Sequence, residues 1–169
     1  AAVLAWVTHV WGPPGGDAAA HLYVTGLWSD HGWLLWDNLW YAGRYAQVNY
    51  SLVYYPAAAL LSAPVVSALA AGAAAWGFGV LVARRWAWAG PWPAWAFALL
   101  APLPVIAGTY PFMLGAAFGV WSLVMLACRR PWAGVALAAA TTLASPLALV
   151  FVLLGAAAGG IALGRDGLR

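Results

Sequence analysis

The feature that most constrains this chain is a series of long apolar runs that end in pairs of arginines. Arg84–Arg85 and Arg129–Arg130 each close such a run, and two single arginines, Arg165 and Arg169, follow the last one. Charged residues make up 7% of the chain and the mean hydropathy is +0.85, whereas an ordinary soluble domain is roughly 25% charged. Such runs are typical of membrane-spanning helices. The sequence therefore predicts an all-α, multi-pass transmembrane helical bundle with about six membrane segments.

The arginines also predict how the chain crosses the membrane. The positive-inside rule places arginine-bearing ends on the cytoplasmic face, so residues 1–12 form the outer end of a first span and residues 13–56 a long outer loop. We expect the following spans at residues 57–83, 86–108 and 112–128. Residues 1–169 then form a single transmembrane domain in the plasma membrane, and we expect this domain to be a fragment of a longer enzyme.

Prolines and turn residues subdivide the later spans. The prolines within residues 86–108 predict a bent or partly unwound segment, because proline removes a backbone donor. "GTYP" (108–111) predicts an outer turn, with Pro111 in the first turn of the next helix.

The last apolar run, residues 131–164, allows two arrangements. A single kinked helix would be about 50 Å long and would exceed a hydrocarbon core of about 30 Å. A hairpin that turns at "TTLASP" (141–146) returns the chain to the cytoplasmic side, and we favour it.

Polar chemistry gathers in residues 15–56, which hold three of the four acidic residues and two of the three histidines. Polar groups are costly in lipid, so a functional site is expected in this outer loop. The net charge of +3 arises from arginines at span ends, so it gives no reason to expect a nucleic-acid partner. No phosphate-binding glycine loop, CxxC, HExxH or GxSxG motif is present in the sequence.

Asp17 and His21 are the first candidate pair in this loop. Asp17 stands where an N-cap is expected before "AAAHLYVTGL", and capping alone would be worth about 1 kcal/mol. The spacing of four residues also places Asp17 and His21 on one helical face. There they could share a proton or ligate a metal.

The segment "WLLWDNLWYAG" (33–43) predicts an interfacial helix over residues 33–42. Trp33, Trp36 and Trp40 recur at helical spacing, and tryptophan favours the membrane–water interface. These rings would anchor the helix, or would stack on sugar faces. Asp37 is the second candidate carboxylate.

Arg44 is the one basic residue predicted on the outer face of the membrane, and Tyr41, Tyr45 and Tyr50 lie near it in sequence. A guanidinium group binds phosphate oxygens in a bidentate manner, so Arg44 could hold a lipid-linked phosphate. The alternative is pairing with Asp37 or with lipid headgroups.

A first span, an outer loop that opens on an acidic residue, an interfacial helix and short apolar hairpins together resemble GT-C-type membrane glycosyltransferases, most closely their multi-pass actinobacterial and archaeal members. The likeness rests on "GDAAAHLYVTGLW", "GWLLWDNLWYAGRY", "YSLVYYP" and "GTYPFMLGAAFG". It implies a polyprenyl-phosphate sugar donor, a glycan or lipid acceptor, and transfer at the outer face. An acidic residue of the first outer loop serves these enzymes as base or metal ligand, and that role falls on Asp17.

Three functions follow as expectations. The favoured one is sugar transfer, with Asp17 and Asp37 as catalytic carboxylates. Asp17 would act as the base, or with His21 it would ligate a divalent cation, Mg²⁺ or Mn²⁺. The alternatives are a non-catalytic membrane assembly subunit and a lipid or sugar transporter. The residues expected to bind substrate are His21, Arg44, Trp36, Trp40 and Tyr45.

Overall fold

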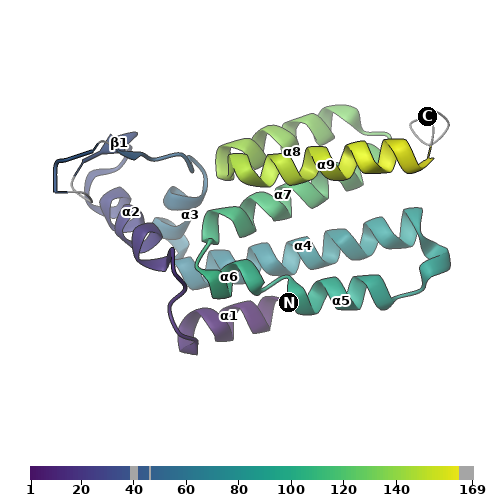
Figure 1. Cartoon of the computed structure of the whole chain (residues 1–169), viewed down its shortest axis with the longest axis horizontal. Helices are drawn as coiled ribbons and strands as arrows, with labels where there is room; N and C mark the ends of the chain where they lie inside the picture. Colours follow the sequence, from purple (N-terminus) through teal and green to yellow (C-terminus); the bar gives the residue numbers. More distant parts are fainter. Residues whose placement is uncertain (39–41, 46, 164–169) are drawn as a thin grey trace.

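The computed structural model describes residues 1–38, 42–45 and 47–163, and helices dominate them (Figure 1). This confirms the predicted all-α class, with one small hairpin of strands added. In chain order the elements are α1 (Ala2–Trp11), α2 (Ala18–His31), β1 (Trp36–Asp37), β2 (Gln47–Val48), α3 (Tyr54–Leu61), α4 (Ala63–Arg85), the 3-10 turn η1 (Ala87–Ala89), α5 (Trp92–Leu100), α6 (Leu103–Ala107), α7 (Tyr110–Ala127), α8 (Pro131–Ala144) and α9 (Pro146–Leu163).

The long helices lie side by side in an elongated bundle (Figure 1). Helix α7 is central and packs against α4, α8 and α9, while α1 and α5 pack against α4. Helices α2 and α3 and the β1–β2 hairpin cover one end of the bundle, and the C-terminal ends of α4 and α7 lie at the opposite end (Figure 1). We refer to these as the loop end and the arginine end.

The arginines predicted that the long loop and the arginine pairs lie on opposite sides, and the two ends of the bundle agree with this prediction. Arg84–Arg85 close α4, where their positive charge complements the helix dipole. At the loop end, the Leu52 amide donates to the Leu143 carbonyl at 2.8 Å, which ties the long loop to the turn between α8 and α9.

The predicted hairpin in residues 131–164 is confirmed. Helix α8 ends at Ala144 and α9 begins at Pro146, and the two run antiparallel (Figure 1). Ser145 between them has extended backbone (φ −159°, ψ 110°), and Pro146 has no N–H with which to continue α8.

The prolines of residues 86–108 act as predicted, because the segment is broken rather than continuous. Helix α5 ends at Leu100 and α6 begins at Leu103, immediately after Pro102. The predicted span 57–83 is also interrupted, which we did not expect. Ser62 has a φ of 76° and separates α3 from α4.

The interfacial helix predicted over residues 33–42 is wrong for the residues that the structure describes. Residues 33–38 are irregular apart from β1, whose Trp36 pairs with Val48 of β2 in an antiparallel register. The Asn49 side chain and main-chain amide donate to the carbonyls of Leu34 and Leu35 at 2.7 and 2.8 Å. Those carbonyls would be needed by a helix starting at residue 33, so Asn49 competes directly with helix formation.

Within the described residues, α4 and α7 are long and apolar enough to cross a membrane. The remaining apolar helices are shorter. The structure therefore supports two candidate membrane spans, and the predicted number of about six membrane segments stays a prediction. The shorter segments are Ala2–Trp11, Trp92–Ala107, Pro131–Ala144 and Pro146–Gly160.

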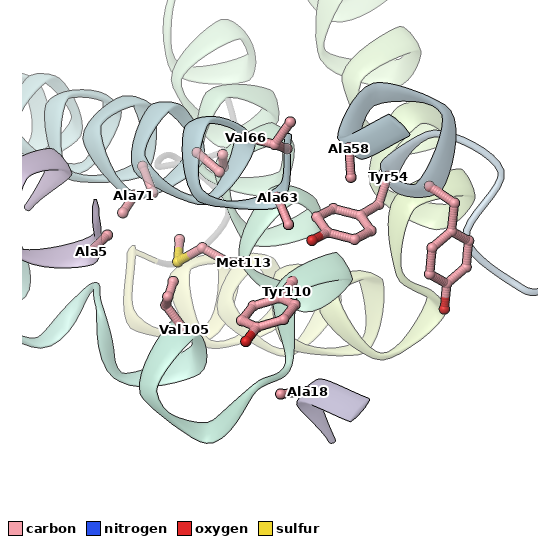
Figure 2. Close-up of a cluster of buried hydrophobic side chains, with 14 of the residues drawn as sticks. Ala5, Ala18, Tyr54, Ala58, Ala63, Val66, Ala71, Val105, Tyr110 and Met113 are labelled. Carbon is pink, nitrogen blue, oxygen red and sulfur yellow. The ribbon is translucent and has the colours of Figure 1, made fainter. Parts of the chain in front are cut away.

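The core lies where α1, α2, α3, α4, α6 and α7 meet, and it is built mainly from small residues with a few large ones (Figure 2). Met113 of α7 and Tyr54 of α3 are the largest fully buried side chains. The rings of Tyr54 and Tyr110 lie 6.3 Å apart and face one another (Figure 2). This aromatic pair connects the core to the loop end.

Candidate functional site

Asp17 occupies the N-cap position of α2, as predicted, but its side chain makes no capping hydrogen bond. Its backbone explains this, because the φ and ψ of Asp17 are −92° and −5°, in the α region. A capping side chain needs extended backbone to reach the amides of the first turn. The carboxylate is instead exposed at the loop end, so the interpretation of Asp17 as only a cap loses its support.

His21, one turn further along α2, is 7% exposed and lies among tyrosines. Its Nδ1 atom is 3.0 Å from the Tyr55 hydroxyl. The centres of the surrounding tyrosine rings lie 6.0 to 6.5 Å from the imidazole. We call this group the His21–tyrosine cluster; its members are His21, Tyr50, Tyr54, Tyr55 and Tyr110.

Burial and the charge of Asp17 shift the pKa of two members of the cluster, His21 and Tyr50. Burial lowers the pKa of His21, and the nearby Asp17 carboxylate opposes part of this shift. Burial likewise raises the pKa of Tyr50, and Asp17 adds to that increase. His21 and Tyr50 are therefore neutral at pH 7, and the field of Asp17 reaches both.

Two close backbone contacts fix the start of α2 against the turn between α6 and α7. A Cβ atom on Gly15 would lie 2.2 Å from the carbonyl carbon of Ala107, and one on Gly108 would lie 2.6 Å from the amide nitrogen of Ala18. Gly108 also has a φ of +84°, a conformation that favours glycine. Asp17 is thus held beside the entry to α7, which supplies Tyr110.

The second predicted carboxylate, Asp37, has a different environment. It is 9% exposed, and its Oδ1 accepts a hydrogen bond from the Tyr23 hydroxyl at 3.0 Å. This bond joins β1 to α2, so Asp37 holds the hairpin to the helix rather than facing solvent.

The other predicted substrate-binding residues lie on the hairpin. Trp36 and Tyr45 are 70% and 61% exposed, and Arg44 is exposed in the segment between the strands. Trp40 lies outside the described residues. The structure therefore places Asp17 and His21 one turn apart at the start of α2, and it leaves Arg44, Trp36 and Tyr45 exposed in the hairpin segment.

Asp17 and His21 do not by themselves form a metal centre. Across residues 1–38, 42–45 and 47–163, no group of three or more His, Cys, Asp or Glu side chains could hold an ion. His21 is 7% exposed and its Nδ1 lies against Tyr55, so the exposed Asp17 is the more accessible ligand of the two. Mg²⁺ commonly binds through one or two carboxylates plus substrate phosphates, so these residues fit a cation brought by a phosphate group.

Sequence reasoning missed the tyrosines of the cluster as site residues. "NYSLVYYP" (49–56) contains three of them within six residues, and that density in an apolar chain was the available signal. Comparison with known proteins adds no assignment, since no protein-family model, curated protein or solved structure matches this chain.

Proposed function

We propose that this chain is a membrane-embedded module of a GT-C-like glycosyltransferase, which transfers a sugar from a polyprenyl-phosphate donor at the outer membrane face. Asp17 carries the proposal. It is an exposed carboxylate without a capping bond, and it stands at the end of the bundle opposite the arginine pairs.

Membrane placement is the first part of the proposal. Helices α4 and α7 support it by length and apolarity, and α9 adds a surface of exposed large apolar side chains that water would disfavour. We assign α1, the α5–α6 pair, α8 and α9 to the remaining membrane segments. Exposed residues of α9 include Leu147, Phe151, Leu153 and Leu154.

Sidedness is the second part. Under the positive-inside rule the arginine end faces the cytoplasm, so the loop end with Asp17 faces outward. A polyprenyl phosphate presents its sugar at the membrane surface, and the first turn of α2 lies directly after α1, the first apolar helix.

In the proposed reaction Asp17 acts as general base. It removes the proton from an acceptor hydroxyl while that oxygen bonds to C1 of the donor sugar. The bond between C1 and the phosphate oxygen breaks, and its electron pair leaves with the phosphate. The buried, neutral His21 and its tyrosine partners hold α2 in place. If Asp17 instead held a divalent cation, that cation would supply positive charge beside the leaving phosphate.

The decisive experiment is Asp17→Asn in the full-length protein, assayed in membranes with a panel of radiolabelled polyprenyl-phosphate hexoses and pentoses. Transfer should fall by about 10²- to 10⁴-fold, the range typical of a lost general base. Asp30→Asn is the matched control, because Asp30 is an exposed carboxylate in the last turn of the same helix. Equal activity of wild type and Asp17→Asn would remove Asp17 from catalysis and favour an assembly subunit.

A further inference from the structure

A cavity lies at the arginine end of the bundle, opposite the loop end. Its volume is about 750 Å³, and it is bounded by the C-terminal ends of α4 and α7, the start of α8, and α9. Arg84, Arg85 and Arg129 all line it. Three arginines from two helix ends therefore line one hollow.

The other walls of the cavity are formed by apolar side chains and by glycines, which have no side chain. Leu81, Leu123 and Leu126 line the side formed by α4 and α7. Gly155 and Gly159 line the side formed by α9, and a Cβ atom added at either glycine would meet no atom within 4 Å. The cavity thus combines a cationic rim with space against apolar side chains.

Acidic side chains that could neutralise this rim lie elsewhere in the described part of the chain. Asp17 and Asp30 belong to α2 and Asp37 to β1, and both elements lie at the loop end (Figure 1). The fourth acidic residue, Asp166, is outside the described residues. The rim of the cavity therefore favours an anion.

The backbone of Arg129 is an independent observation. Its φ is 57°, and the amides of Arg129 and Arg130 donate to the carbonyls of Leu126 and Met125 at 3.0 and 2.9 Å. This is the Schellman pattern at a helix end, whose left-handed position normally holds glycine. An arginine here keeps a backbone conformation that is unfavourable for a side chain, and this same residue lines the cavity.

We infer that this cavity binds the phosphate headgroup of an anionic phospholipid in the cytoplasmic leaflet. The arginines bind the phosphodiester oxygens through charge-assisted hydrogen bonds, and the leucines contact the upper part of the acyl chains. Basic pockets between membrane helices on the cytoplasmic side bind such headgroups. The inference rests on the membrane placement proposed above, and it is independent of Asp17 and of sugar transfer.

Native mass spectrometry of the full chain in detergent tests this site, with phosphatidylglycerol and phosphatidylcholine as the two probes. Wild type should retain phosphatidylglycerol in preference. Arg129→Gly should bind it about tenfold more weakly, since a hydrogen bond to a charged group is lost, yet its melting temperature in phosphatidylcholine should stay equal or rise because glycine suits the left-handed position.

Two further variants distinguish lipid binding in the cavity from attraction of the lipid to general surface charge. Arg130→Gln removes the same charge one position away, from an exposed arginine that does not line the cavity, so it should bind like wild type. Gly159→Leu fills the hollow without changing charge, so it should reduce retention of phosphatidylglycerol.

Equal losses in Arg129→Gly and Arg130→Gln would overturn the inference in favour of diffuse attraction. Equal retention of the two lipids, or displacement of phosphatidylglycerol by millimolar inorganic phosphate, would overturn it as well. Release of the chain from membranes by alkaline carbonate would instead refute membrane placement, on which the proposed function also depends. Loss of transfer in Asp17→Asn leaves the lipid site untouched.

Discussion

Asp17 shows that a residue can occupy the N-cap position of a helix without making the capping hydrogen bond. The residue lies where an N-cap belongs, but its α-region backbone turns the carboxylate away from the amides of α2. An exposed acid that makes no capping hydrogen bond is available for chemistry, which is why the proposed function rests on it.

The first prediction concerns the stability of Asp17 variants. Because no capping bond is made, Asp17→Ala should change the free energy of unfolding by less than about 0.5 kcal/mol, whereas loss of a true cap costs about 1 kcal/mol. Thermal unfolding in detergent measures the difference. A loss of the full capping energy would mean that Asp17 caps α2 in solution.

His21 provides a second prediction at this scale. Burial lowers its pKa in the folded protein below the unfolded value of 6.5, so the unfolded chain binds more protons between the two values. Stability should therefore be fully present above about pH 6.5 and should fall as the pH drops through that value toward the folded pKa.

Melting temperatures measured between pH 7.5 and 5 test this dependence. His21→Gln should give a shallower decline than wild type, because it removes the titrating group. His31→Gln is the control, since His31 is exposed at the other end of α2. A decline of unchanged steepness in His21→Gln would assign the pH sensitivity to other groups.

At the element scale, glycines set how closely helices approach. A Cβ atom on Gly119 of α7 would lie 2.3 Å from the Cγ2 atom of Val152 on α9, which is closer than real contacts allow. Val152 is branched at Cβ and stiff, so it yields only if α9 moves. Gly26 of α2 is the opposite case, with no atom within 4 Å of such a Cβ.

The third prediction contrasts these two glycines. Gly119→Ala should destabilise the protein by about 1–3 kcal/mol, as overpacking of a core does. Gly26→Ala should stabilise it by up to about 1 kcal/mol, because alanine is the better helix former. Thermal or denaturant unfolding of both variants checks the signs, and a neutral Gly119→Ala would show that α7 and α9 can separate without cost.

The two ends of the bundle define the behaviour of the whole molecule. Helix α2 and the hairpin of the long loop lie at one end, and the C-terminal ends of α4 and α7, beside the arginine pairs in sequence, lie at the other (Figure 1). If the chain spans a membrane, each end should be accessible from one side only.

Cysteine labelling of intact cells or oriented vesicles tests that fourth prediction, in a background where the single native Cys128 is replaced by serine. Cysteines at Gly32 and Thr109 should react with an impermeant reagent from outside, and cysteines at Trp88 and Trp132 should not. The last two positions are 86% exposed, so protection there would come from the membrane. Outside labelling at Trp132 would contradict the assigned orientation.

Much of the architecture could be predicted from residues whose effects are local. Arginine pairs mark where α4 and α7 end, Pro102 breaks the segment between them, and Pro146 separates α8 from α9. Each of these residues acts through backbone geometry or charge at its own position, so its effect on the helix ends can be predicted without knowledge of tertiary contacts.

The site was less accessible because its contacts are distant in sequence. His21 and Tyr55 are 34 positions apart, and no periodicity links them. The tryptophan spacing near residue 33 favoured a helix, but Asn49 binds the carbonyls of Leu34 and Leu35 from a later segment. In the first case a tertiary contact brings the site residues together, and in the second it determines the local backbone structure.

The hydrogen bond between Leu52 and Leu143 has a consequence for biosynthesis. The ribosome synthesises the long loop well before the end of α8. The hydrogen bond from the Leu52 amide therefore cannot form until Leu143 has been synthesised. The contacts of Gly15 with Ala107 and of Gly108 with Ala18 impose a similar delay on α2. The loop end should therefore reach its final form only after translation has passed residue 143, so nascent chains stalled before that point should be cut by protease within residues 13–56.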